Sequence, residues 1–349
     1  MKFSVIIPAY HAEKTLGACL QSVRQQTFAD FEAIVIDDGS ADGTRFVAEQ
    51  FTLSDPRFRY IRQENRGVSA TRNHGIAEAK GEFIVFLDSD DRYDRAYLQQ
   101  FHEMTAAYPD CDHFWCGFRS VDPQGRDLGC TVWPDEGGTY HILERDRIMD
   151  LHEKTLDAAL WNKTFRRQIL QTHGLRMDES LSLGEDLLFN FGYLDVSGPR
   201  IVVSSRPLYL YTKAADGTLD SKYRPDLKEI YEGVNARLLT YLQRWEVSPA
   251  QMTKFYNSVF YTLERVLYNT YRPECAMTPA EKRKFNSEIL KSSHFRQTFN
   301  QTDCSIHPLY RRAYEIGSWN CVLLLDALVN LKKKLGTWGR NTKQVQKEE

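Results

Sequence analysis

The chain has few of the features that define membrane, secreted or nucleic-acid-binding proteins. Among its 349 residues, no apolar run reaches the length of about 18–20 residues that spans a bilayer. The formal net charge of -2 lacks the basic excess usual in nucleic-acid-binding proteins, so we expect no nucleic-acid partner. The first apolar run, residues 4–7, is too short for the core of a secretory signal. We therefore expect a cytoplasmic protein.

The cysteine and glycine patterns exclude further classes. The seven cysteines are an odd number, and Cys111 and Cys116 are too far apart for a C-x-x-C motif. No zinc-type Cys/His spacing occurs, so we expect reduced, mostly buried thiols. The sequence also contains no Walker loop and no G-x-G-x-x-G fingerprint. Any nucleotide site in this chain therefore uses another arrangement of residues.

Strand and helix signals alternate through the first hundred residues. Short apolar runs predict strands at 3–8, 31–36, 57–61 and 82–87, and helical spacing predicts helices at 14–26, 44–51 and 68–79. This alternation indicates an α/β fold with a Rossmann-like, mostly parallel sheet flanked by helices. Such sheets bind ligands beyond the C-terminal ends of their strands.

The pattern changes after residue 95. Residues 113–121 and 127–132 predict a hairpin, and later signals predict helices at 93–104, 144–153, 162–171 and 185–196 and a strand at 207–212. From residue 225 the signals are almost wholly helical. We therefore predict one α/β domain with halves 1–95 and 96–224, followed by a helical C-terminal extension, 225–349.

An acidic cluster, Asp88-Ser89-Asp90-Asp91, directly follows the strand at 82–87. Carboxylates at the mouth of a buried strand are costly without a partner. Mg²⁺ and Mn²⁺ prefer oxygen ligands and bridge to phosphate, so we predict that Asp90 binds such a cation and Asp88 a ribose or a metal-bound water. A helix N-cap is the alternative, but it accounts for only one Asp.

Other polar residues follow the strands in order. Tyr10 closes the first strand and can stack under a base, although a rim tyrosine is the simpler interpretation of that residue alone. In the Asp37-Asp38 pair, one carboxylate can bind uracil or ribose while the other caps a turn. Gly67 lets a loop approach a ligand, and Arg72 offers a fork-shaped donor to a diphosphate.

Two adjacent acids, Glu185 and Asp186, open the predicted helix at 185–196. Acids at a helix start can simply favour the dipole, and local sequence alone favours that interpretation. The functional alternative is a general base for an acceptor hydroxyl. The two interpretations differ in whether Asp186 lies near Asp90.

Taken together, these stretches resemble glycosyltransferase family 2, the inverting enzymes of the A-type glycosyltransferase fold. The matching motifs are Val5-Ile6-Ile7-Pro8-Ala9-Tyr10, Gln25-Gln26-Thr27-Phe28, Ile36-Asp37-Asp38-Gly39-Ser40, residues 64–73 and 81–91, Trp161-Asn162-Lys163 and Gly184-Glu185-Asp186. The resemblance implies an inverting transfer of a hexosyl or N-acetylhexosaminyl group to a glycan or lipid-linked glycan hydroxyl. It also implies a role in bacterial surface polysaccharide synthesis, whether of capsule, exopolysaccharide or lipopolysaccharide.

The resemblance assigns roles to individual residues. The nucleotide-sugar donor, usually a UDP-sugar, would be bound by Pro8, Tyr10, Glu13, Asp38, Arg72, Asp88 and Ser89. Mn²⁺ or Mg²⁺ would be held by Asp90. Asp186 would be the catalytic base with Glu185 beside it, and the acceptor would be bound by Trp161, Asn162 and Lys163. Residues 1–95 would then be the donor half and residues 96–224 the acceptor half.

The chain departs from the family pattern at three places. His11 stands where Asn is common, Arg66 replaces a frequent Gly, and the loop after Tyr211 carries Lys213 where relatives often have Arg and Ser. Three other classes compete. A haloacid-dehalogenase-type phosphohydrolase places its D-x-D after the first strand rather than the fourth, and a nucleotidyltransferase usually has a glycine-rich phosphate loop. A non-catalytic binding module needs neither the metal motif nor the acidic pair.

Residues 319–335 combine an apolar side with the basic run 332–334. One interpretation is an interfacial helix on anionic lipid, which would bring the protein to the inner face of the cytoplasmic membrane. The other is a core helix of the C-terminal bundle with a solvated basic end.

Overall fold

The computed structural model describes residues 1–134, 138–213 and 222–328. The chain forms two compact units, residues 1–221 with 229–252 and residues 222–228 with 253–349. The predicted halves of the α/β domain, 1–95 and 96–224, lie in the first unit up to residue 221. Helix α8 (Leu227–Arg244) was expected to open the C-terminal region, yet from residue 229 onward it belongs to the first unit.

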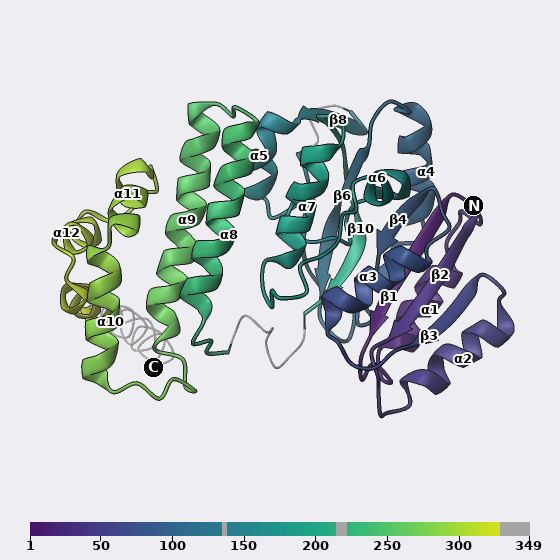
Figure 1. Ribbon diagram of the computed structural model, residues 1–349, viewed down its shortest axis with the longest axis horizontal. Helices are drawn as coiled ribbons and strands as arrows, with labels where there is room; N and C mark the ends of the chain where they lie inside the picture. The colour runs from purple at the N-terminus through teal and green to yellow at the C-terminus, as the bar shows by residue number, and fades with distance from the viewer. Residues whose placement is uncertain (135–137, 214–221, 329–349) are drawn as a thin grey trace, which may run out of the picture. The chain divides into compact units, whose positions relative to one another are not determined.

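The first unit contains a five-stranded sheet in the order β3-β2-β1-β4-β9 (Figure 1). Its parallel strands are β1 (Phe3–Ala9), β2 (Phe31–Asp37), β3 (Phe58–Arg62) and β4 (Phe83–Phe86), with β9 (Phe165–Arg166) antiparallel at the edge. The connecting helices are α1 (Leu16–Arg24), α2 (Thr44–Ser54) and α3 (Val68–Glu78). The predicted mostly parallel sheet with covering helices is confirmed.

A second sheet has the order β5-β10-β6-β7, and β8 also pairs with β10. Its strands are β5 (Arg92–Tyr93), β6 (His113–Val121), β7 (Asp127–Thr131), β8 (Tyr140–Glu144) and β10 (Arg200–Thr212). The predicted hairpin is present as β6 and β7, closed by a turn in which Gly125 N donates to Asp122 O at 2.8 Å. Strand β8 was not predicted, and β10 begins seven residues before the expected start.

The remaining helices of the first unit are η1 (Arg145–Arg147), α4 (Tyr97–Ala107), α5 (Ile148–His152), α6 (Arg167–Thr172) and α7 (Glu185–Val196). Alternate side chains of β1 point to opposite faces of the first sheet. Val5 and Ile7 belong to a buried core shared with α1 and α4, whereas Ile6 belongs to one shared with α3, α6 and α7. Helix α3 lies so close to the sheet that a Cβ at Gly75 would overlap Ile6 Cγ2.

Two helix predictions were wrong at their starts. Helix α4 begins at Tyr97 without a side-chain cap, because Arg92 and Tyr93 pair with β10 instead. Asp91 does not cap this helix: its carboxylate accepts hydrogen bonds from Tyr209 Oη at 2.7 Å and Thr212 N at 2.6 Å. The helix expected at 162–171 begins only at residue 167, since residues 165–166 form β9.

The second unit is helical. It contains most of α9 (Pro249–Asn269) and the helices α10 (Pro279–Lys291), α11 (Ser293–Gln301) and α12 (Pro308–Ile316). Phe260 packs against Phe295, Phe299 and Tyr314 with ring centroids about 6 Å apart. No helix within the described part of the chain is long and apolar enough to cross a bilayer. Residues 329–335 of the predicted C-terminal helix, and the loop 214–221 after Lys213, lie outside the described residues.

Candidate active site

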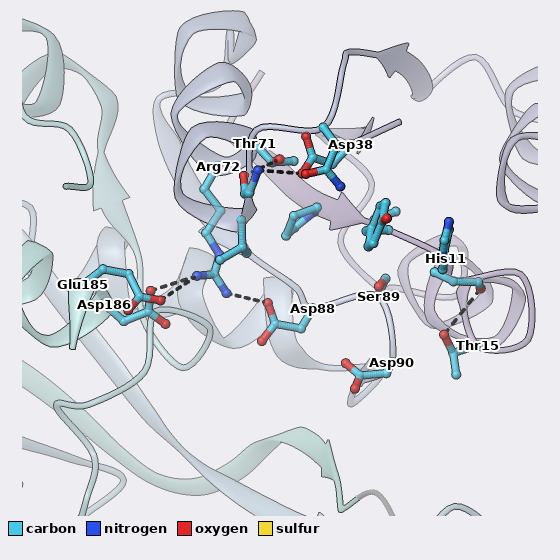
Figure 2. A pocket seen from close by; sticks show the side chains of 17 residues that line it. His11, Thr15, Asp38, Thr71, Arg72, Asp88, Ser89, Asp90, Glu185 and Asp186 are labelled. Atoms are coloured by element: carbon cyan, nitrogen blue, oxygen red, sulfur yellow. Dashed lines mark hydrogen bonds and ion pairs between the residues drawn. The ribbon is translucent and has the colours of Figure 1, made fainter. Parts of the chain in front are cut away.

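A pocket of about 780 Å³ opens where β1, β2 and β4 end (Figure 2). This volume is in the range of small-molecule sites. Nine of the predicted site residues line it: Pro8, Tyr10, Asp38, Arg72, Asp88, Ser89, Asp90, Glu185 and Asp186. It is also lined by residues that were not assigned a ligand role from sequence: Ala9, His11, Ala12, Thr15, Asn65, Gly67, Val68 and Thr71. Most of these lie inside the matching motifs, which is the signal that could have found them.

Asp38 organises one wall of the pocket. Its buried carboxylate accepts hydrogen bonds from Gln63 Nε2 at 2.8 Å, Arg66 N at 2.9 Å and Gly67 N at 2.8 Å. Gly67, with φ +89°, is the N-cap of α3. Asp37 takes the turn role, accepting from Ser40 N at 2.9 Å and from Tyr60 Oη at 2.6 Å. One acid of the pair therefore caps the turn, and the other faces the pocket.

Two stacked aromatic rings also line the pocket. The Tyr10 ring is 52% exposed and stacks on the His11 ring with centroids 4.1 Å apart and planes 14° apart. His11 has a positive φ of 50°, and its N donates to Ser40 Oγ at 3.0 Å. A large exposed ring inside a pocket offers a stacking surface for a planar ligand. Glu13, predicted as a donor ligand, does not line the pocket: it accepts from Gly43 N at 2.8 Å.

Arg72 connects the two acidic motifs (Figure 2). Its guanidinium is buried, with Nη2 2.8 Å from Asp88 Oδ1, Nη1 2.8 Å from Asp186 Oδ1 and 4.0 Å from Glu185 Oε1. The acidic pair at the start of α7 therefore lies in the same pocket as the acidic cluster after β4. Favouring a helix dipole does not explain this contact between residues 114 positions apart. In this arrangement Arg72 pairs with carboxylates on both sides. To bind a diphosphate as predicted, it would have to give up its contact with Asp88 or Asp186.

Negative charge exceeds positive charge around Arg72. Burial raises the pKa of Asp186 to about 7, and the charges of Glu185 and Asp88 act in the same direction. The ion pair with Arg72 opposes this rise without cancelling it, because three carboxylates share one guanidinium. A carboxyl with a pKa near neutrality is suited to taking up a proton during a reaction.

Asp90 has the character expected of a cation ligand. It is exposed to the pocket, and no ion pair joins it to a basic side chain within the described ranges. Partial loss of hydration, followed by the charge of Asp88, raises its pKa. The described residues contain no group of three or more His, Cys, Asp or Glu side chains arranged around one metal position. The carboxylates of Asp90 and Asp88 are the ligand type that a hard cation prefers, and such a cation can take its other ligands from phosphate and water.

The three predicted acceptor ligands lie in the core rather than along the pocket. Trp161 is 8% exposed and stacks on Tyr209 with centroids 4.0 Å apart, and Tyr209 Oη accepts from Asp88 N at 3.3 Å. Asn162 and Lys163 are buried, and their nitrogens donate to backbone carbonyls. Direct contact of these residues with an acceptor is not supported by this arrangement.

A parallel sheet with a D-x-D cluster, a stacking tyrosine and a paired acid in one pocket defines an A-type glycosyltransferase fold. The family model of glycosyl transferase family 2 matches residues 4–174, so the chain contains a domain of this family. The sequence is 35% identical over 191 residues to the putative glycosyltransferase EpsH of Bacillus subtilis, covering 54% of each chain. It is 29% identical over 230 residues to the uncharacterized glycosyltransferase EpsJ of the same organism, covering 65% of each. The matches thus span about half to two thirds of these relatives.

The fold is also similar to a solved structure. The crystal structure of Staphylococcus aureus TarS residues 1–349 in complex with UDP-GlcNAc matches with a TM-score of 0.64 at 22% identity. This match covers 90% of the present chain and 88% of that one. In sequence, the chain is 28% identical over 239 residues to the S. aureus poly(ribitol-phosphate) beta-N-acetylglucosaminyltransferase TarS, which covers 66% of this chain and 39% of TarS.

Proposed function

We propose that this protein is an inverting glycosyltransferase that transfers a sugar from a UDP-sugar to a hydroxyl of a glycan or lipid-linked glycan. The bridge from Asp88 through Arg72 to Asp186 carries the proposal, because it brings a donor-binding motif and a candidate base into one pocket. One relative is named a poly(ribitol-phosphate) beta-N-acetylglucosaminyltransferase, which supports a bacterial polymer as the product. An N-acetylhexosamine is the first sugar to test, since a structure of similar fold contains UDP-GlcNAc.

The walls of the pocket suit the two ends of a nucleotide. The free face of the Tyr10 ring offers stacking to the base, and the carboxylate of Asp38 offers acceptors to uracil N–H or ribose hydroxyls. Asp90, with Asp88 nearby, would hold Mn²⁺ or Mg²⁺. That cation, when bound, supplies positive charge against the charge that develops on the leaving diphosphate.

The proposed reaction is a single displacement at the anomeric carbon. The acceptor oxygen forms the new glycosidic bond while the bond from the anomeric carbon to the diphosphate oxygen breaks, which inverts the configuration. Asp186 takes the hydroxyl proton, and its pKa near 7 places the free base close to neutral pH. Glu185, the preceding residue on the same helix end, shapes the electrostatic surroundings of that base.

The Asp186→Asn variant tests the role of the base. We expect it to bind UDP-GlcNAc with Mn²⁺ as the parent does, measured by calorimetry, and to lose about 10²–10⁴-fold in turnover. The exposed Asp110 provides the matched control, Asp110→Asn, which should keep full turnover. Parental turnover of Asp186→Asn would refute the assignment of the base.

The Asp90→Ala variant tests the metal assignment. We expect donor binding by the parent to tighten when Mn²⁺ is added and binding by the variant to show no such gain. The donor screen uses nucleotide sugars with and without glycan acceptors, and mass spectrometry identifies the product. In a separate assay with UTP and a sugar 1-phosphate, release of pyrophosphate would indicate a nucleotidyltransferase instead. Saturable binding without turnover on any donor would indicate a binding module.

A further inference from the structure

Lys163 is a buried cation outside the pocket. Its side chain is 1% exposed, and no ion pair joins it to a carboxylate among the described residues. Its Nζ donates to the carbonyl oxygens of Leu156 (3.1 Å) and Ala159 and to Asn162 Oδ1 at 2.6 Å. The ammonium also lies 4.5 Å from the centre of the Trp115 ring. A buried charge solvated by three protein oxygens has a defined position and is costly to keep.

The segment 156–163, here called the Lys163 cradle, also binds α7, the helix that carries the candidate base. Asn190 of α7 is 1% exposed, and its Nδ2 donates to Asp157 O at 2.6 Å and to Ala159 O at 3.0 Å. Lys163 Nζ and Asn190 Nδ2 therefore share the carbonyl of Ala159. Asn190 lies four residues after Asp186, which places both on one side of α7. The segment 156–163 is thus bound to the base helix one turn from the base.

The charges around this cradle are opposite in sign to Lys163. Asp157 is fully buried and attracts it, and Asp186 attracts it from the pocket side. Asp157 also accepts from His152 Nδ1 at 2.8 Å. Burial lowers the pKa of Lys163 to about 7, and attraction to Asp157 and Asp186 opposes this fall. Asp186 in turn faces Arg72, Glu185 and Asp88.

We propose that Lys163 is a positioning residue for Asp186, fixing helix α7 through the carbonyl of Ala159 and the amide of Asn190. This inference rests on the proposed function, because it takes Asp186 as the base. It replaces the predicted acceptor role of Trp161-Asn162-Lys163 with a supporting role behind the pocket. Loss of the cradle would let the base shift, and misplacement by about 1 Å can cost about 100-fold in rate.

A double-mutant cycle tests the proposal. Turnover is measured as release of UDP from UDP-GlcNAc with Mn²⁺. We expect Lys163→Met to lower kcat by about 10- to 100-fold at unchanged KM, and to lower it no further in an Asp186→Asn background. The exposed Lys284 gives the same chemical change far along the chain, and Lys284→Met should match the parent. An equal loss in both backgrounds would show a general structural role and overturn the proposal.

Amide hydrogen exchange gives a second readout that needs no turnover. We expect Lys163→Met and Asn190→Ala to speed exchange at the start of α7, while Lys284→Met leaves it unchanged. If Lys163→Met does not fold, Asn190→Ala carries both measurements. Unchanged exchange at α7 in the folded variants would contradict the proposal. If Asp186→Asn alone kept parental turnover, the proposed function would fail, and the exchange result would still decide whether Lys163 fixes the helix.

Discussion

Arg72 determines the electrostatics of the candidate site at the scale of single residues. It is buried and pairs with carboxylates from two distant parts of the chain, Asp88 and Asp186. Its positive charge lowers the pKa of Asp186 against the effect of burial and neighbouring acids. The pKa of this candidate base is therefore close to neutral pH, rather than far above or below it.

Replacing Arg72 by Gln should make the base harder to ionise. Without the guanidinium, the pKa of Asp186 rises, so the free base forms only at higher pH. We expect the acidic limb of the pH profile of kcat to move to higher pH and turnover at pH 7 to fall. Arg66→Gln is the control, since Arg66 lies on the loop beside the pocket but pairs with the exposed Glu179. An acidic limb at the parental pH in Arg72→Gln would refute this coupling.

His113 should make the fold sensitive to acid. Burial lowers its pKa from the ordinary 6.5 to about 3, and its Nε2 lies 2.6 Å from Ser197 Oγ. Between pH 6.5 and 3 the unfolded chain binds a proton at this residue that the folded chain does not. The free energy of unfolding therefore falls as the pH drops through this range.

Urea unfolding at pH 7, 6 and 5 measures this contribution. We expect the free energy of unfolding to fall less steeply with decreasing pH in His113→Asn than in the parent. The variant itself should be less stable at pH 7. The exposed His173 supplies the matched control, and His173→Asn should keep the parental slope. The same slope in His113→Asn as in the parent would mean that other groups cause the decline.

At the scale of elements, the sequence predicted those strands and helices whose bounds depend on the residues within and next to them. The parallel strands were found because their apolar runs are buried on both faces, and α7 has its predicted bounds because a glycine and two acids mark its start. Contacts between distant parts of the chain could not be found in this way. Asp91 binds Tyr209 and Thr212 of β10, and the Ala159 carbonyl that accepts from Lys163 also accepts from Asn190 of α7. No periodicity encodes such partners.

The start of α7 is also fixed by a steric requirement. Gly184 has φ +82°, and a Cβ at this position would lie 2.8 Å from Val234 Cγ2 on α8. Gly174 has φ +61° with no atom within 4 Å of such a Cβ. Both glycines have the left-handed backbone conformation that disfavours other residues. Only Gly184 also packs closely against a second helix, and it does so next to the candidate base.

Alanine at the two glycines should therefore have different effects. We expect Gly174→Ala to cost about 1–2 kcal/mol from the left-handed backbone alone. Gly184→Ala should cost about 1–3 kcal/mol more through overpacking, and should lower turnover by displacing Asp186. Denaturant unfolding measures both, and Val234→Ala should restore part of the loss only with Gly184→Ala. Equal stability of the two glycine variants would show that the contact with α8 is unimportant.

At the scale of the whole molecule, charge is unevenly distributed along the chain. Basic residues outnumber acidic ones in residues 253–349, whereas acidic residues are in excess in 1–252. The described part of the predicted C-terminal helix has two kinds of side chain. Trp319 and Val322 are fully buried, while Leu324 and Leu328 are 61% and 54% exposed. The buried side chains suit the interpretation of 319–335 as a core helix. The exposed leucines suit the interpretation as an interfacial helix.

We expect this outer surface to contact anionic lipid, which would bring the enzyme to a lipid-linked acceptor. Exposed leucines that precede the basic run 332–334 in the sequence suit an interface that combines apolar burial with attraction to charged headgroups. The double variant Leu324→Glu, Leu328→Glu should lose flotation with phosphatidylglycerol vesicles, and parental flotation should weaken as salt rises. Point variants are preferable to truncation after Ile316, because truncation also removes the buried Trp319. Leu53→Glu with Leu128→Glu, at two exposed leucines of the first unit, is the matched control and should float as the parent does. Equal flotation of both double variants would mean that the surface around Leu324 does not bind lipid.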